Sequence, residues 1–310
     1  MTRASRSAVR GRFAPSPSGD LHVGNLRTAM LAWLCARSAG GGFVLRVDDL
    51  DERARPAFAA RQLADLVSVG VDWDGPILWQ SRRRAAYRAA IDELAARGLV
   101  YECWCSRREI AEAARAPHSG GGAYPGTCRR LSGARRRALR AGAPRPPSLR
   151  LAAAVAEYEI ADLVHGRHVG PVHDVVLQRW DGTPAYHLAV VVDDAAQGVT
   201  QVVRGGDLLG ASPTQAYLAA LLGLPEVVYG HVPLVVDRAG ARLAKRSASA
   251  SGSPVALADL AAAGQPPEAV ARTLLRSLGS PADTLAGALA SFDMRQVPGE
   301  PVLWRPAAGR

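Results

Sequence analysis

The sequence contains no run of about 20 apolar residues, the length that a membrane-spanning helix needs, so we expect no transmembrane segment. Its basic start, MTRASRSAVRGR, is not followed by an apolar segment, so we expect no secretory signal. Cysteine is scarce: four residues among 310 are too few for a disulfide framework. We therefore expect reducing, cytoplasmic surroundings, with no membrane partner.

Lysine is almost absent, because Lys245 is the only lysine among 38 basic residues. Such a preference for arginine indicates codon bias, but the excess over 28 acidic residues still leaves a net charge of +10. Charge alone therefore favours a polyanionic partner such as nucleic acid, and the alternative is a basic enzyme without one. The length allows a substantial core and about two domains of about 150 residues each.

The first 50 residues predict a strand, a loop, a helix and a strand. A short strand at 12–14 enters the Pro/Ser/Gly-rich loop 15–20, and apolar residues at helical spacing predict a helix over 23–38. FVLRV, at 43–47, is a continuous apolar strand. This β-α-β order predicts an α/β fold with a parallel sheet, whose ligands lie at the carboxyl ends of the strands.

The rest of the chain predicts more helices and strands around an inserted segment. Helices are expected over 54–69, 82–97, 213–222 and within 254–289, and strands over 174–178, 186–192, 201–204 and 232–236. The segment from 101 to about 147 holds three of the four cysteines and the basic run 135–140. Asp193 and Asp194 end an apolar strand, so they could face a nucleotide, but we expect them to cap or to be solvated. Histidines such as His231 show no ligand or triad spacing.

The block APSPSGDLHVGN, at 14–25, is the most informative motif. It delivers an imidazole, His22, and a glycine, Gly24, to the start of the predicted helix, where free N–H groups and the helix dipole favour phosphate. The block closely resembles the HIGH signature of class I aminoacyl-tRNA synthetases, in the form used by the glutamyl and glutaminyl enzymes. Asn25 stands at the second histidine of that signature. The resemblance implies that His22, Gly24 and Asn25 bind ATP and that His22 is catalytic.

Lys245 lies in RLAKRS, before a Ser/Gly-rich stretch. A lysine on a mobile loop can close over ATP and neutralise the leaving pyrophosphate. The segment is similar to the KMSKS loop of the same family, with Ala244 at the position of a serine. The resemblance therefore implies a catalytic and ATP-binding role for Lys245.

An amino acid with two carboxylates and one ammonium needs arginines and an acid around it. Arginines occur in RFAPS and VVRGGDLL, and RVDDLD supplies an acid. By their order and spacing these segments resemble the glutamate pocket of the glutamyl enzymes, where the acid is usually a glutamate. The positions that the resemblance assigns to glutamate binding are Arg12, Phe13, Ala14, Pro15, Ser16, Asp48, Tyr186 and Arg204.

Cys103, Cys105 and Cys128 lie close together in the inserted segment. Three thiols in a reducing setting favour one structural zinc ion, and the alternative is three reduced cysteines without a metal. Spacing leaves Tyr124 or His118 as the fourth ligand, and zinc chemistry favours the histidine. A Cys-x-Cys, Tyr-x3-Cys site, however, is typical of the glutamyl-Q tRNA(Asp) synthetases, and this resemblance implies Tyr124.

The resemblance to that family covers the segment from about Gly11 to Ser247, after which 63 residues remain. It implies a ligase of the class I synthetase type that activates glutamate with ATP and Mg²⁺ and transfers it to queuosine in the anticodon of tRNA(Asp). A monomer is expected. The expected parts are the first half of a Rossmann-like nucleotide-binding domain (1–100), a zinc-binding insertion (101–150), the second half with the Lys245 loop (151–247), and a small helical region without an anticodon-binding domain (248–310).

Three alternatives stay open at this stage. The first is a short glutamyl-tRNA synthetase that charges the 3′ end of its tRNA. The second is an inactive tRNA-binding or regulatory relative, which Ala244 and the short acid Asp48 would favour. The third is an adenylating ligase with a small-molecule acceptor, which the basic charge disfavours.

Overall fold

The computed structural model describes residues 8–106, 108–110, 124–241, 243 and 255–304. Its strands are β1 (Arg10–Phe13), β2 (Gly42–Val47), β3 (Leu78–Trp79), β4 (Val100–Cys103), β5 (Ser148–Leu151), β6 (Glu157–Asp162), β7 (Gly166–Pro171), β8 (Val176–Gln178), β9 (Gln201–Gly205), β10 (Val228–Val232), β11 (Val235–Val236) and β12 (Val302–Leu303). Its α-helices are α1 (Val23–Ser38), α2 (Pro56–Ser68), α3 (Arg84–Ala96), α5 (Gly133–Gly142), α6 (Tyr186–Ala196), α7 (Ser212–Leu221), α8 (Leu257–Ala262), α9 (Pro267–Ser277) and α10 (Leu285–Ala288). Short 3₁₀ helices are η1 (Gln80–Arg83), η2 (Gly206–Ala211), η3 (Leu289–Ser291) and η4 (Met294–Gln296).

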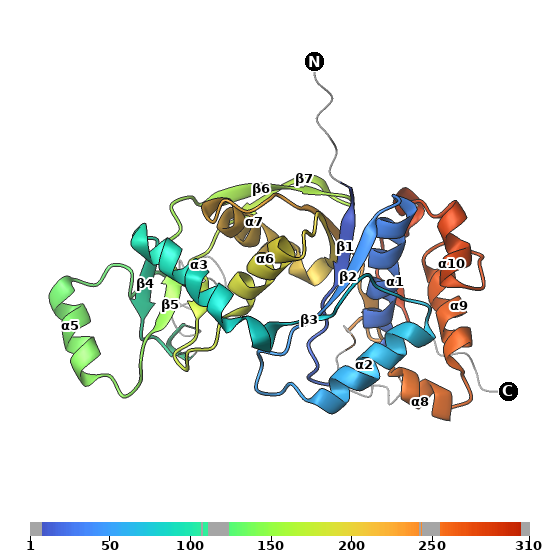
Figure 1. The fold of residues 1–310 in the computed structure, drawn as a ribbon, viewed down its shortest axis with the longest axis horizontal. Coiled ribbons are helices and arrows are strands. Elements are labelled where there is room, and N and C mark those ends of the chain that lie inside the picture. Colours follow the sequence, from blue (N-terminus) through green and yellow to red (C-terminus); the bar gives the residue numbers. More distant parts are fainter. Residues whose placement is uncertain (1–7, 107, 111–123, 242, 244–254, 305–310) are drawn as a thin grey trace, which may run out of the picture.

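A parallel sheet lies at the centre of the molecule, as the sequence predicts (Figure 1). One part has the strand order β1-β2-β3 and the other β7-β6-β10-β9, in which only β7 runs antiparallel to its neighbour. The two parts meet at β1 and β9, where the Thr200 N–H donates to the Arg10 carbonyl at 2.9 Å. The chain leaves β1 toward β2 and leaves β9 toward β10, in opposite directions, and such a point is where open α/β sheets bind ligands.

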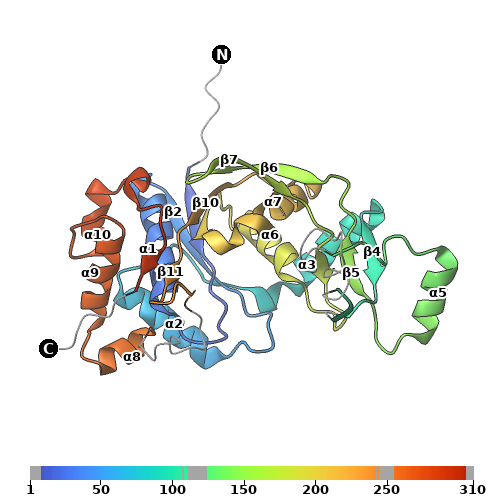
Figure 2. The same ribbon diagram turned by 180° about the vertical axis from the view of Figure 1, so that it is seen from behind.

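Helix α1 is buried on nearly all sides and organises the larger core. It packs against β1 and β2 on one side and against α9 and α10 on the other (Figure 2). The fully buried Arg27 joins these layers, since its guanidinium donates to the Ser277 hydroxyl at 3.1 Å and to the Pro233 carbonyl at 3.1 Å. The C-terminal helices are therefore part of the same core as the sheet, and the helix predicted over 23–38 is confirmed.

The expected strand over 186–192 is wrong, because these residues form the start of helix α6. A short apolar run has no periodicity that separates a buried strand from a buried helix. Helix α6 packs against α3 and α7 and buries Leu188 to Val191, so tertiary contacts decide its conformation. The expectation that Asp193 and Asp194 cap or are solvated is wrong as well, since both are buried within this helix.

The cysteine-rich segment begins and ends on paired strands. Strand β4 pairs antiparallel with β5, which pairs antiparallel with β8, and helix α5 projects beyond this small sheet (Figure 1). Helix α5 buries no residue. Among the described residues no helix has the length and apolar character required to cross a bilayer.

Candidate active site

A cavity of about 300 Å³ opens at the carboxyl ends of β1 and β9, where the two parts of the sheet meet. It brings together every predicted ATP- and glutamate-binding residue that the structure describes. The predicted residues that line it are Arg12, Phe13, Ala14, Pro15, Ser16, His22, Gly24, Asn25, Asp48, Tyr186 and Arg204. Lys245 lies outside the described residues.

His22 forms the N-cap of α1 and exchanges hydrogen bonds with Asn25. The Asn25 backbone N–H donates to His22 Nδ1 at 3.2 Å, and the His22 N–H donates to Asn25 Oδ1 at 3.3 Å. Because Nδ1 is an acceptor, the neutral ring carries its hydrogen on Nε2. Asn25 therefore orients the imidazole, a role that the comparison with a histidine signature did not predict.

The packing of this ring leaves little room for a side chain at Gly24. A Cβ atom there would lie 3.0 Å from both Cε1 and Nδ1 of His22, and 3.3 Å from Cβ of Val235. The expected row of free amide groups at the start of α1 is reduced, because the Val23 N–H donates to the Val255 carbonyl at 2.9 Å. The start of α1 therefore offers fewer free backbone N–H groups to an anion than the sequence predicts.

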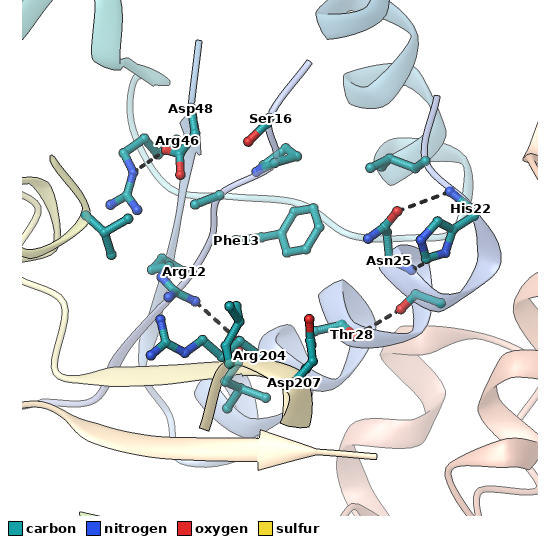
Figure 3. A pocket seen from close by; sticks show the side chains of 18 of the residues that line it. Arg12, Phe13, Ser16, His22, Asn25, Thr28, Arg46, Asp48, Arg204 and Asp207 are labelled. Carbon is teal, nitrogen blue, oxygen red and sulfur yellow. Dashed lines mark hydrogen bonds and ion pairs between the residues drawn. The ribbon is translucent and has the colours of Figure 1, made fainter. Parts of the chain in front are cut away.

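Three buried arginines lie on the opposite side of the cavity from His22 (Figure 3). Two are predicted, Arg12 and Arg204, and the third is Arg46, which sequence analysis missed. Arg46 Nε donates to Asp48 at 2.7 Å and its Nη1 to Asp194 at 2.5 Å. An arginine inside an apolar strand requires a buried acid, and this is the signal in the sequence that could have revealed it.

Two buried carboxylates contact these arginines. Asp48 and Asp194 form ion pairs with Arg46, and Arg12 Nε lies 3.5 Å from Asp194. Burial raises the pKa of Asp48 to about 6, against the opposing influence of Arg46. Arg46 Nη2 and Arg12 Nε are buried without a hydrogen-bond partner among the described residues. Donors of this kind suit an anionic ligand.

Arg204 differs from Arg12 and Arg46 in its partners, none of which is a carboxylate. It donates to His231 Nε2 at 3.1 Å, to the Ser212 hydroxyl at 2.5 Å and to Gln215 Oε1 at 2.7 Å. Its Nη1 also lies 3.4 Å from the half-exposed Tyr186 hydroxyl. Sequence analysis assigned His231 no role, and its spacing could not reveal this contact.

The three predicted cysteine ligands converge in the cysteine-rich segment. Their sulfur atoms lie within 4.8 Å of one another, and Sγ of Cys105 and Cys128 are 3.5 Å apart. A tetrahedral zinc ion with Zn–S bonds of about 2.3 Å requires sulfur atoms about 3.8 Å apart, so the set fits. Tyr124 Oη lies 3.4 Å from Cys103 Sγ and 3.8 Å from Cys105 Sγ, in reach of the same ion.

Burial shifts the acidity of the groups in this cluster. It raises the pKa of Cys105 to about 12 and raises the pKa of Tyr124, so both groups stay protonated in the absence of a metal ion. Burial would also raise the pKa of Cys128, but hydrogen bonds such as that with Tyr124 outweigh this effect, so the pKa of Cys128 is lowered. The Arg150 guanidinium lies 3.9 Å from the centre of the Tyr124 ring. His118, the alternative fourth ligand, lies outside the described residues.

Comparisons with known proteins agree with this architecture. The family described as "tRNA synthetases class I (E and Q), catalytic domain" matches residues 8–294. The glutamyl-Q tRNA(Asp) synthetase of Nocardia farcinica (strain IFM 10152) is 60% identical over 291 residues, which cover 94% of this chain and 91% of that protein. That of Symbiobacterium thermophilum is 46% identical over 312 residues, 94% of each protein.

A solved structure gives the same result for the fold. The glutamate tRNA ligase from Elizabethkingia meningosepticum CCUG26117, solved in complex with its amino acid, is 25% identical with a TM-score of 0.81. The similarity covers 97% of this chain and 68% of that one. By the family match and the relatives at 60% and 46% identity, the chain belongs to the class I tRNA synthetases of the E and Q type, a family of ligases.

Proposed function

We propose that this protein activates glutamate with ATP and transfers it to the queuosine base of tRNA(Asp). The observation that carries the proposal is the single cavity at the β1–β9 junction, which unites carboxylate-binding arginines, an acid for the ammonium, and the His22–Gly24 turn. These groups come from three separate segments of the sequence. The names of the relatives supply the acceptor, tRNA(Asp).

The positions of these groups suggest how glutamate lies in the cavity. Its α-carboxylate must reach the α-phosphate of ATP, so that end faces His22 and Gly24. The side-chain carboxylate then lies among the arginines on the opposite side, with Arg12 and Arg204 as donors (Figure 3). The Asp48 carboxylate accepts a hydrogen bond from the ammonium group of glutamate. Phe13 to Ser16 form the wall between the two ends.

In the first step a glutamate α-carboxylate oxygen attacks the α-phosphorus of ATP, giving glutamyl-adenylate and pyrophosphate. The Nε2–H of His22 donates to the phosphate as negative charge develops there. Lys245 neutralises the leaving pyrophosphate, and Mg²⁺ accompanies the nucleotide. In support, Leu243, two residues before Lys245, donates its N–H to the carbonyl of the cavity residue Val235 at 3.5 Å.

In the second step a hydroxyl of the queuosine cyclopentenediol attacks the carbonyl carbon of the adenylate, and AMP leaves. Positioning and charge stabilisation suffice for this transfer, so no covalent enzyme intermediate is needed. Arginines of the inserted segment, including Arg135 and Arg137 on the exposed helix α5, are available to the RNA backbone. The relatives named glutamyl-Q tRNA(Asp) synthetase, 60% and 46% identical to this chain, support the queuosine acceptor.

The proposal also includes one structural zinc ion. Cys103, Cys105, Cys128 and Tyr124 would hold it, and it would stabilise the inserted segment without entering the reaction.

The decisive experiment supplies the protein with labelled glutamate, ATP and tRNA from queuosine-positive and queuosine-negative cells. We expect label only on the first pool, with the product ester on tRNA(Asp). Equal labelling of both pools would refute the modified-base acceptor. Nuclease removal of the terminal adenosine of the tRNA separates the alternative, since charging at the 3′ end requires that nucleotide and transfer to queuosine does not. Absence of glutamate-dependent ATP–pyrophosphate exchange would instead indicate an inactive relative.

A further inference from the structure

Arg204 is held in place by a buried chain of polar groups that crosses three neighbouring strands. His231 on β10 is the register partner of Arg204 on β9, so the two side chains lie side by side. His231 Nδ1 lies 2.6 Å from Asp162 Oδ2, at the end of β6. All three residues are buried, with exposed fractions of 1% for His231, 5% for Arg204 and 6% for Asp162.

The hydrogen bonds of Asp162 determine which nitrogen of His231 carries the hydrogen. The Asp162 carboxylate accepts the backbone N–H groups of Val164 at 2.8 Å and His165 at 3.0 Å, as well as that of His231 at 3.1 Å. Although burial opposes it, these bonds and the contact with the His231 ring lower the pKa of Asp162 to about 2. An ionised Asp162 is only an acceptor, so Nδ1 of His231 donates to it.

The other ring nitrogen then faces Arg204 as an acceptor. His231 Nε2 accepts the Arg204 Nε–H at 3.1 Å and lies 2.8 Å from the Ser212 hydroxyl. Burial and the nearby Arg204 lower the pKa of His231, with Asp162 opposing them, so the ring is neutral. A protonated ring would place a second positive charge against Arg204.

We propose that His231, held by Asp162, is a positioning residue for glutamate: it fixes the Arg204 guanidinium through a neutral acceptor and so leaves its charge to the side-chain carboxylate of the substrate. A carboxylate in direct contact would hold Arg204 equally well but would neutralise it. Arg46, which bonds directly to Asp48 and Asp194, illustrates that other arrangement. The proposal rests on the glutamate-activating function proposed above.

The first test removes the acceptor and then restores it. In ATP–pyrophosphate exchange, His231→Leu is expected to raise the KM for glutamate about tenfold or more, with kcat and the KM for ATP within about threefold of wild type. His231→Gln places an amide oxygen near the position of Nε2, so it is expected to restore the KM to within about threefold. A merely structural role would not produce this rescue or this restriction to one substrate.

The second test changes the charge without changing the shape. Gln215 accepts a hydrogen bond from Arg204 Nη2 at 2.7 Å, and within the described part of the chain its own amide nitrogen is buried without a hydrogen-bond partner. Gln215→Glu therefore keeps the contact and supplies the neutralising carboxylate. We expect a KM for glutamate raised about tenfold and an unchanged thermal unfolding temperature. If His231→Leu does not fold, the KM for glutamate of Gln215→Glu tests the proposal in its place.

These experiments distinguish failure of the role proposed for His231 from failure of the proposed function. A wild-type protein that shows no glutamate-dependent exchange refutes the function, before any variant is compared. An active wild type with an unchanged KM for glutamate in folded His231→Leu overturns the role of His231. Failure of His231→Gln to restore the KM overturns it too, as does an unchanged KM in Gln215→Glu.

Discussion

The side chains and backbones of His22 and Asn25 form two reciprocal hydrogen bonds, 3.2 and 3.3 Å long, at the start of α1. Asn25 thus orients the ring of its neighbour in the motif and also lines the cavity itself. The imidazole presented to the cavity is oriented by an amide that also caps the helix. The catalytic role proposed for His22 is therefore coupled to the local stability of this turn.

Two substitutions of Asn25 separate these roles. Asn25→Ala removes the side-chain acceptor, so we expect a loss of about 1 kcal/mol in the free energy of unfolding and a reduced exchange rate. Asn25→Asp keeps the acceptor but adds a negative charge beside the phosphates, so stability is expected to hold while the KM for ATP rises. Denaturant unfolding and exchange kinetics measure the two effects. Equal ATP kinetics in Asn25→Asp and wild type would contradict phosphate binding at this turn.

Gly24→Ala is expected to reduce the rate of ATP–pyrophosphate exchange by about threefold to tenfold, because the added Cβ would lie 3.0 Å from the His22 ring, so the ring must shift by a few tenths of an ångström. Gly210 is the matched control, since a Cβ there has no neighbour within 4 Å. Gly210→Ala is therefore expected to keep full activity. Similar rates for both variants in ATP–pyrophosphate exchange would show that the position of the imidazole is unimportant.

Glutamate binding is expected to weaken in acid, with a midpoint near pH 6. The raised pKa of Asp48, about 6, means that its carboxylate gains a proton as the pH falls through this value. A neutral acid binds the substrate ammonium less well, so the KM for glutamate should rise about tenfold per pH unit below 6. ATP–pyrophosphate exchange assays from pH 5 to 8 measure the KM for glutamate, with the KM for ATP as the internal reference.

Asp48→Asn provides the control for this pH dependence. It is expected to have a high KM for glutamate at every pH and to lack the midpoint near 6, because the titrating carboxyl is gone. If the variant retained the wild-type profile, Asp48 would not be the group responsible.

Metal analysis is expected to find one zinc ion per chain, and Cys105→Ser is expected to lose it and to lower the unfolding temperature. Cys35→Ala is the control, because this buried thiol lies in α1 outside the cluster. Tyr124→Phe should weaken zinc binding, whereas His118→Ala should leave it unchanged. The opposite result for these two variants would move the fourth ligand to His118.

Contiguous motifs are the part of the site that the sequence predicts well. The block at 14–25, the helix over 23–38 and the three cysteines depend on short spacings, and the structure assembles them as expected. Helix α6 was predicted incorrectly because its apolar run lacks a distinguishing period. That error also hid Asp194, whose partners are Arg12 and Arg46.

The sequence by itself determined the family, the α/β order of the first half and the residue types of the site, because these depend on neighbours along the chain. The tertiary structure alone decided which buried charges meet. The apolar strand around Arg46 indicates only that a buried acid must pair with it. Asp194 and His231 carry no local signal, since their partners lie in other strands and helices. Whether an arginine keeps its charge for a substrate depends on those distant partners, and only the packing of the strands brings them together.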